Sequence, residues 1–272
     1  MNAPSQFEFL FILFCVILSH LNNGIVSFNA LKSWWAPGFV LQGASFRNTG
    51  KLFMAGDGDT PPLFTLGAPN WYNSGLIVMY QNNDCRANVN LGAALQTIVN
   101  DGSICLHHSF YTQATSIQGR GCFTADSGST IHIANMFLPI SPDQQYYLAD
   151  PKSSLVVQAF QTPATFNVYG FGNGNMIGLD VSLSLGKKGY SYNPDTGILT
   201  LTGGLFNCVT QHFNIGKNYD PRMFERVTDK TSGILWPASL GAIRYNGDVP
   251  NKAIPQECYC ESPPAWPTSP QQ

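Results

Sequence analysis

The sequence predicts an all-β protein: a right-handed β-helix (β-solenoid) followed by a compact C-terminal β region. A short motif recurs at nearly constant spacing along the chain. Helical periodicity is almost absent, because Pro or Gly interrupts most windows. Gly, Asn, Ser and Thr are abundant while charged residues are few, as expected for a turn-rich β protein with polar, uncharged surfaces. With 272 residues, the chain can bury a substantial core.

The repeated motif is Asn-x-Gly followed by an alternating apolar run. Its glycines lie at positions 24, 50, 75 and 102, so the spacings are 26, 25 and 27 residues. We expect the Asn-x-Gly segment to form a turn, because Gly adopts positive φ without steric cost and Asn tolerates it. A period near 25 residues corresponds to one coil of a β-solenoid, in which each strand stacks on its counterpart one coil away.

The chain divides into four parts when the strand and turn patterns are followed beyond these copies. Further rungs are expected at 119–123, 129–133 and 154–158. From about residue 163 the strands at 165–169, 190–192 and 197–201 are joined by turns rich in Asn, Gly and Pro. The expected parts are an apolar leader (1–20), solenoid coils (21–162), a C-terminal β portion of the same domain (163–260) and a Pro/Ser-rich tail (261–272).

Charge excludes two classes of partner. Charged residues make up 11% of the chain and the formal net charge is −2. There is no basic run, so we expect no binding to nucleic acid or to an anionic membrane surface.

An apolar run at 9–18 has the length of a signal-peptide core and is too short to span a bilayer. Ser19 could precede a cleavage site, whereas the region before the run contains Glu8 and no Lys or Arg. The run is therefore either a secretion signal within residues 9–19 or a buried first strand of the domain. No other segment approaches eighteen apolar residues, so we predict no transmembrane span.

Six of the seven cysteines are disulfide candidates, because Cys15 lies within the apolar run. The alternative is a set of buried thiols. A bridge between Cys258 and Cys260 would be strained, so a partner such as Cys85 or Cys208 is expected for them. None of the spacings matches a zinc site. The six candidates are Cys85, Cys105, Cys122, Cys208, Cys258 and Cys260.

No motif predicts a catalytic, cofactor or metal site. The glycine-rich segment 170–175 precedes an expected strand rather than a helix, so it is interpreted as a turn and not as a phosphate loop. Asp57 and Asp59 lack the further ligands of a calcium loop and indicate an exposed loop. His107 and His108 are adjacent on an expected strand and should point to opposite faces, as a surface pair.

An enzyme would need carboxylates gathered on one face, as in glycosidases. The carboxylates do not recur at the coil period, and most lie next to turns, where Asp has a structural role. The residues considered are Asp84, Asp101, Asp126 and Asp150.

Aromatic side chains in loop-like contexts are better candidates for binding, since they can stack on sugars or peptides; the alternative is core packing or capping of the solenoid ends. These residues are Trp34, Trp35, Trp71, Tyr72, Tyr80 and Phe110. The sequence contains no N-x-S/T site for N-glycosylation.

Nine stretches of the chain, taken in order, carry a family resemblance. They are NNGIVSFNAL (22–31), FRNTGKLFMAG (46–56), NWYNSGLIVMYQN (70–82), IVNDGSICL (98–106), IQGRGCFTAD (117–126), YYLADPKSSLVVQAF (146–160), TFNVYGFGNGNMIGL (165–179), YSYNPDTGILTL (190–201) and FNIGKNYD (213–220). On these stretches, the chain from about residue 21 to 260 resembles the N-terminal domain of the yeast hyphally regulated cell-wall proteins, a group of glycosylphosphatidylinositol-anchored adhesin-like proteins.

The resemblance implies a β-helix with a C-terminal β portion, secretion, and an extracellular location in the cell wall. It implies adhesion or host interaction, with cell-wall polysaccharide or a host surface as partner and no cofactor. The alternatives are a structural wall component without a ligand and, less favoured, a polysaccharide-active β-helix enzyme. Cys105 and Cys122 occur in the shared motifs and follow turns of successive coils, so a bridge between them is expected. We expect no lipid-anchor signal in this chain, which resembles a truncated copy.

Overall fold

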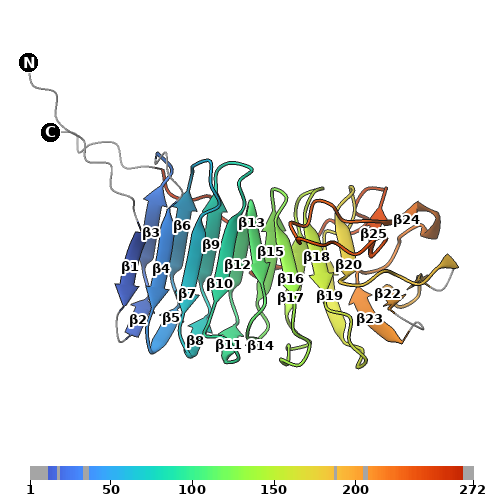
Figure 1. Ribbon diagram of the computed structural model, residues 1–272, viewed down its shortest axis with the longest axis horizontal. Helices are drawn as coiled ribbons and strands as arrows, with labels where there is room; N and C mark the ends of the chain where they lie inside the picture. The colour runs from blue at the N-terminus through green and yellow to red at the C-terminus, as the bar shows by residue number, and fades with distance from the viewer. Residues whose placement is uncertain (1–11, 17–18, 33–36, 187–188, 205–207, 266–272) are drawn as a thin grey trace, which may run out of the picture.

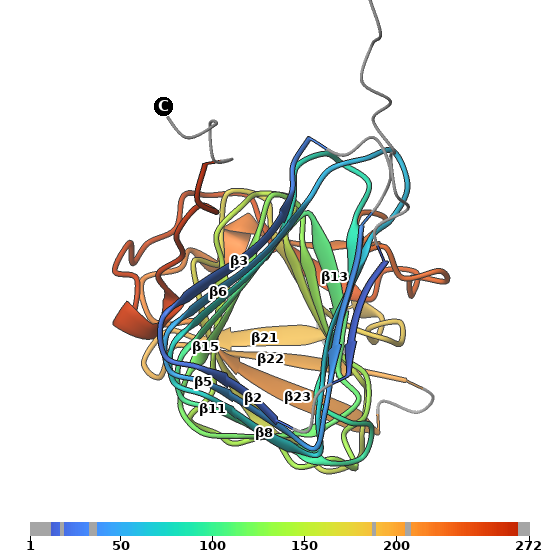
Figure 2. The same ribbon diagram turned by 90° about the vertical axis from the view of Figure 1, so that its left-hand side faces the viewer.

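The computed structural model describes residues 12–16, 19–32, 37–186, 189–204 and 208–265. In this part the chain is a β-solenoid of about six turns, followed by a smaller β region that lies at the far end of the stack (Figure 1). Viewed down its axis, the solenoid has a roughly triangular cross-section with one sheet on each side (Figure 2). The predicted fold class is confirmed.

Three sheets run along the solenoid. Their strands, in spatial order, are as follows. Sheet A contains β1 (Ile12–Val16), β4 (Gly38–Gln42), β7 (Leu63–Gly67), β10 (Ala87–Leu91), β13 (Ser109–Thr112), β16 (Thr130–Ile133), β18 (Ser154–Val157), β20 (Met176–Leu179), β25 (Ala242–Tyr245) and β24 (Phe224–Val227). Sheet B contains β14 (Ser116–Gln118), β11 (Thr97–Asn100), β8 (Asn70–Asn73), β5 (Ser45–Asn48) and β2 (Ser19–Asn22). Sheet C contains β21 (Tyr190–Asn193), β22 (Ile198–Gly203), β23 (Val209–Asn214), β19 (Thr165–Tyr169), β17 (Gln145–Leu148), β15 (Cys122–Asp126), β12 (Ser103–His107), β9 (Leu76–Gln81), β6 (Lys51–Gly56) and β3 (Ile25–Ala30).

The glycines of the repeat stack on one another, but for a different reason than the sequence suggested. A Cβ at Gly50, Gly75 or Gly102 would lie only 2.0–2.2 Å from the carbonyl oxygen of the preceding glycine in the stack. None of these residues is among those with positive φ. The expectation of a positive φ was therefore wrong: Gly is required here because the backbones of neighbouring turns approach too closely for any side chain.

The asparagines of the same motif form a continuous hydrogen-bonded ladder. The amide Nδ2 of each residue donates to Oδ1 of the next: Asn22 to Asn48 at 2.7 Å, Asn48 to Asn73 at 2.8 Å and Asn73 to Asn100 at 2.9 Å. Asn100 continues the chain to Oε1 of Gln144 at 3.3 Å. Asn48, Asn73 and Asn100 are fully buried, so their amides need these partners.

Inside the triangle, the core contains stacked aliphatic and aromatic side chains. Successive turns place Tyr111 on Phe123, Phe123 on Tyr146 and Tyr146 on Phe166, with ring centroids 5.3–6.0 Å apart. No single turn could bury these rings alone, so neighbouring turns stabilise each other.

Parallel stacking continues past residue 162. β19 pairs in parallel with β17, and β20 pairs in parallel with β18. The pairs within the region that follows are antiparallel: β21, β22 and β23 form a meander, and β24 pairs with β25, which pairs with β20. The meander joins the solenoid through β23, which pairs in parallel with β19. β21–β23 lie across the end of the solenoid (Figures 1 and 2). The rungs and late strands predicted from the sequence are confirmed as β15, β16, β18, β19, β21 and β22.

Part of the apolar leader is a strand in the structure. Residues 12–16 form β1, which pairs in parallel with β4. This arrangement corresponds to the first-strand alternative; the rest of the predicted secretion signal, including residues 9–11 and 17–18, lies outside the described residues. Within those described, no helix has the length and apolar character needed to cross a membrane.

The C-terminal segment 246–265, which we call the strap, runs back along the outer face of sheet C toward the first turns. Two disulfides hold it: Cys122–Cys258, with Cα atoms 5.0 Å apart, and Cys105–Cys260, with Cα atoms 5.9 Å apart. The strap includes the short 3-10 helix η4 (Gln256–Cys258); the other, η3 (Pro221–Met223), precedes β24. Farther along the strap, Glu261 forms an ion pair with Lys51 at 2.6 Å. Residues 261–265 of the predicted tail are thus attached to the solenoid.

The predicted Cys105–Cys122 bridge was wrong. The two residues do lie on adjacent strands, but the parallel register places Cys105 opposite Thr124 and Cys122 opposite Ser103. This offset of two residues keeps the sulfur atoms apart and leaves both available to the strap. Cys85 and Cys208, the suggested partners of Cys258 and Cys260, are in neither bridge; the Cys85 thiol instead donates to the carbonyl of Asp59 at 3.2 Å.

Candidate functional site

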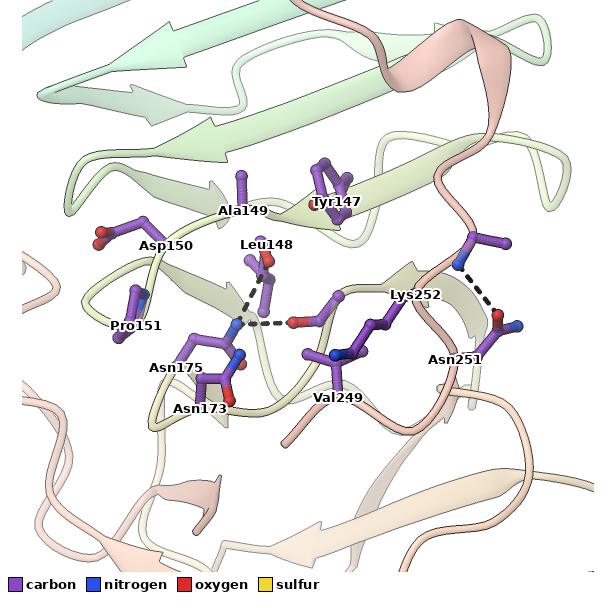
Figure 3. Close-up of a pocket in the computed structure, with 12 residues that line it drawn as sticks. Tyr147, Leu148, Ala149, Asp150, Pro151, Asn173, Asn175, Val249, Asn251 and Lys252 are labelled. Atoms are coloured by element: carbon purple, nitrogen blue, oxygen red, sulfur yellow. Dashed lines mark hydrogen bonds between the residues drawn. The ribbon is translucent and has the colours of Figure 1, made fainter. Parts of the chain in front are cut away.

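A polar cavity of about 230 Å³ lies between the strap and the late solenoid turns. Its solenoid wall comes from the segment after β17 and from the turn after β19, and its other wall comes from the strap (Figure 3). We call this cavity the strap pocket. The lining residues are Tyr147, Leu148, Ala149, Asp150, Pro151, Gly170, Asn173, Asn175, Val249, Asn251, Lys252 and Ala253.

A buried asparagine fixes the turn at the base of the strap pocket. The Asn175 amide donates to the carbonyls of Gly170 at 2.8 Å and Leu148 at 3.3 Å, and its Oδ1 accepts from the Gly172 N–H at 2.9 Å. Figure 3 shows the two bonds from the Asn175 amide to the carbonyls of Gly170 and Leu148. The glycine-rich segment 170–175 is therefore a turn followed by strand β20, as predicted.

Within that turn, Asn173 lies in the left-handed region with φ of 55°. Its backbone N–H donates to the carbonyl of Gly247 at 2.8 Å, which ties the turn to the strap. Its side chain is exposed, and its amide group has no partner among the described residues. The turn thus presents a free amide at the cavity.

Two charged side chains of opposite sign line the strap pocket. Oδ1 of Asp150 accepts from the N–H groups of Gly128 at 3.0 Å and Lys152 at 2.8 Å, which fixes the carboxylate and leaves Oδ2 without a partner in the described chain. The ammonium of Lys252 has no ion pair with any described residue. Figure 3 shows its side chain extending from the strap toward the asparagine side of the cavity. The lining as a whole carries no net charge.

Tyr147 adds a phenol ring. Its pKa is raised, chiefly by burial and further by the nearby Asp126 and Tyr259, so the hydroxyl is neutral at physiological pH and can both donate and accept. Gly170 lies directly beside the ring, since a Cβ there would be 2.5 Å from the Tyr147 Cε2. The ring is thus held at the edge of the cavity.

A second, more charged cavity of about 380 Å³ adjoins the strap pocket and shares Asp150 with it. Arg86, Lys152 and His108 are among its lining residues. The Arg86 guanidinium is half-buried, and this burial lowers its pKa while Asp229 and Asp84 oppose that effect. The two cavities meet at the Asp150 turn and together follow one corner of the solenoid.

The expectation that His107 and His108 point to opposite faces was wrong. His108 has φ of 43°, which ends the regular strand and turns its ring back. Both Nδ1 atoms lie 3.0 Å from the carbonyl oxygen of Gln81, and the two rings contact edge to face. They are half-buried rather than a surface pair.

Ser127 lies 2.8 Å from Nε2 of His107, which resembles a nucleophile and base. In a catalytic triad a carboxylate orients the base, whereas here the Nδ1 of His107 contacts the Gln81 carbonyl. The two neighbouring N–H groups, those of Ser127 and Gly128, already donate to carboxylates of Asp126 and Asp150. This loop therefore offers neither of its own N–H groups to an oxyanion.

The carboxylates considered from the sequence are bound within turns. Asp101 accepts from the Arg120 N–H, and Asp126 from the Ser127 N–H. Asp84 lies 3.2 Å from Nε2 of His108. Asp57 accepts from Gly58, Asn82 and Asn83. Within the described ranges, no cluster of three or more His, Cys, Asp or Glu side chains is placed to hold a metal ion.

The aromatic candidates divide between core and surface. Trp71 is buried in the core on Phe46, whereas Tyr72 lies under the Arg47 guanidinium and Tyr80 stacks on His107. Phe110 is partly exposed, and Trp34 and Trp35 lie outside the described residues.

Sequence reasoning missed two features. Trp236 is 84% exposed in the loop before β25. The strap residues of the pocket were also missed, because nothing in their local sequence shows that disulfides carry them back onto sheet C.

The family model and the most similar curated proteins point to the same family. The family described as "Hyphally regulated cell wall protein N-terminal" matches residues 6–267. Among curated proteins of Candida albicans, the chain is 47% identical to Cell wall protein RBR3 over 252 residues, 44% to Hyphally regulated cell wall protein 3 over 253 and 40% to Hyphally regulated cell wall protein 1 over 253. Each alignment covers 92% of this chain but only 16%, 20% and 26% of the relative. The chain therefore belongs to the hyphally regulated cell wall protein N-terminal family.

Proposed function

We propose that this chain is an adhesin-like binding domain displayed at the outer surface of a fungal cell wall, where it binds wall polysaccharide or a host surface. Membership of a cell-wall protein family supports the extracellular location. The observation that carries the binding role is the strap pocket: a cavity held by two disulfides, whose lining includes the Asn173 amide, the Asp150 Oδ2 and the Lys252 ammonium without a partner in the described chain.

The solenoid provides the rigidity that such a role requires. Parallel ladders and two disulfides fix the positions of the cavity walls before a ligand arrives. Binding to a preformed site loses less conformational entropy than binding to a mobile one. A purely structural wall component would not need free polar groups in a cavity, and an enzyme would need a reactive arrangement that the Ser127 loop does not supply.

Attachment of beads coated with the full chain tests this function. We expect saturable attachment to cultured epithelial cells or to purified wall glucan particles, and loss of attachment after heat unfolding. Equal attachment of beads coated with folded chain, unfolded chain and albumin would contradict adhesion and leave the structural role.

Export is the second part of the proposal. A tag at the C-terminus of the chain, expressed in yeast, should be recovered from the medium or the wall. Retention of the tagged chain in the cytosol would contradict the proposed location at the cell surface.

A further inference from the structure

We infer that the strap pocket binds a neutral hexose unit of a polysaccharide chain, and that the two disulfides keep this site formed. The inference rests on the proposed binding function and assigns it a place and a ligand chemistry. The groups at the cavity are amides from Asn173 and Asn251, one carboxylate, one ammonium and one phenol.

The hydrogen-bonding inventory suits a ligand with many hydroxyls. Asn173 offers both its amide NH₂ and its carbonyl oxygen, Asp150 offers Oδ2, and Lys252 offers three N–H donors. A sugar hydroxyl donates and accepts at once, so it can pair either with an acceptor such as Asp150 or with a donor such as Lys252. The phenol of Tyr147 can take either role.

Charge argues for a neutral ligand. Asp150 and Lys252 contribute one charge each, with opposite signs, so the lining neither attracts nor repels an ion strongly. The apolar surface of Tyr147 and Val249 is small, which disfavours a bulky apolar side chain. A ring with hydroxyls at its rim and C–H groups on its faces matches this mixture of polar edge and aromatic contact.

Size and openness argue for one unit of a longer chain. The cavity of about 230 Å³ is smaller than those that enclose drug-sized ligands, roughly 300–1,000 Å³. It is not closed, because it adjoins the second cavity at Asp150. A polysaccharide could place one ring in the strap pocket and continue along the corner of the solenoid.

The strap makes the site depend on the disulfides. Val249, Asn251 and Lys252 all belong to the strap, a few residues before Cys258. They are held between β25 and the Cys122–Cys258 bridge. Reduction would release this wall while leaving the parallel ladders of the solenoid in place, so the cavity would open without unfolding of the stack.

The test measures binding of the full chain to neutral laminari- and manno-oligosaccharides by isothermal titration calorimetry, with an acidic hyaluronan oligosaccharide and a short peptide as comparison. Two variants remove pocket groups: Asn173→Gly, which keeps the positive φ, and Lys252→Met. Matched controls are Asn218→Gly, at another exposed asparagine with positive φ, and Lys217→Met, at its exposed neighbour.

We expect a neutral oligosaccharide to bind, with each pocket variant weakening the binding by about three- to tenfold, as expected for the loss of one hydrogen bond. The controls should bind like the unmodified chain. Reduction should abolish binding while the far-ultraviolet circular dichroism spectrum keeps its β signature.

Three results would overturn the inference: no binding of any neutral oligosaccharide, equal binding by pocket and control variants, or binding of hyaluronan or peptide alone. If coated beads still attach to cells or glucan particles in any of these cases, the adhesive function stands and its site lies elsewhere. If the beads also fail to attach, both proposals fall.

Discussion

The first solenoid turns and the later part of the chain use the same kind of strand but differ in regularity. In sheet A, partners on the first four strands are 25 or 26 residues apart, whereas later partners are 20 to 24 apart. The regular turns carry the stacked glycines and most of the asparagine ladder. The shorter turns and the strap carry the two polar cavities. The scaffold and the candidate site are thus separated along the axis, and perturbing each should have a different readout.

Removing the bridge that closes the strap should have the largest effect on stability. The Cys105–Cys260 bridge remains in the variant below, so the loop that Cys122–Cys258 closes is only about 20 residues long, and its loss costs about 3.2 kcal/mol of unfolding free energy. Urea denaturation of the Cys122→Ser/Cys258→Ser variant measures this cost. Hydrogen exchange should show faster opening of the strap than of β6 and β9; uniform opening of both regions would mean that the two regions are not separable.

Breaking the glycine stack should destabilise the regular turns next most strongly. A Cβ at Gly75 would lie 2.0 Å from the carbonyl oxygen of Gly50, so Gly75→Ala must push two turns apart. We expect a loss of about 3 kcal/mol in urea denaturation. Gly24 has no atom within 4 Å of the equivalent position, so Gly24→Ala is the matched control and should change stability little. Equal effects of the two variants would refute the close-packing explanation.

Interrupting the asparagine ladder should cost somewhat less. Asn73→Ala leaves the amide of Asn48 and the Oδ1 of Asn100 with one partner fewer in a buried environment. We expect about 2 kcal/mol of destabilisation by chemical denaturation. Asn88, which is exposed on β10, supplies the control Asn88→Ala, and a loss no larger than that of the control would show that the ladder adds nothing to stability.

The smallest effect concerns pH at the corner next to the second cavity. Burial lowers the pKa of His107, while the Gln81 carbonyl and nearby carboxylates partly oppose this shift. Because the folded-state pKa is below the unfolded value of about 6.5, the unfolded chain binds more protons as the pH falls below that value. Stability should therefore fall between pH 7 and pH 5, by less than about 1 kcal/mol for this half-exposed group.

Denaturation midpoints of the unmodified chain and of His107→Gln measure this effect. The slope should be shallower in the variant, with the remainder coming from His132, whose pKa burial also lowers. An unchanged slope would assign the pH dependence to other groups.

Local pattern was sufficient to predict the coil period and the strands that follow the Asn-x-Gly turns, because the same pattern returns one turn away. Strands without that motif in the first coils, such as β4, β7 and β10, were not predicted. The role of the glycines was predicted wrongly, because the close approach between Gly50 and Gly75 is a contact between turns and cannot be seen in the local sequence. The turn at His108 was missed for a related reason: its φ of 43° is imposed by the packing of the histidine rings around Gln81.

The candidate site could not be predicted from the sequence, because one of its walls is formed by the strap, which is distant in sequence from the other wall. The family motifs and the turns of successive coils favoured a bridge between Cys105 and Cys122, whereas the two bridges in the structure span 155 and 136 residues. Without the strap's position, Lys252 and Asn251 look like residues of an ordinary loop. Contacts made over such separations follow from the path of the whole chain.

The strap also determines how the domain would carry mechanical load. Asn29 on β3 donates to the carbonyl of Pro264, so the last described residues leave the molecule beside its first turns. A pull applied beyond residue 265 first reaches the Cys105–Cys260 bridge on β12 and then the Cys122–Cys258 bridge on β15. Tension thus reaches the middle of the solenoid through the two disulfides. The strap-pocket wall at residues 249–253 precedes both bridges in the chain, so the bridges shield it from this load. Shear from the exit point would not peel the cavity open.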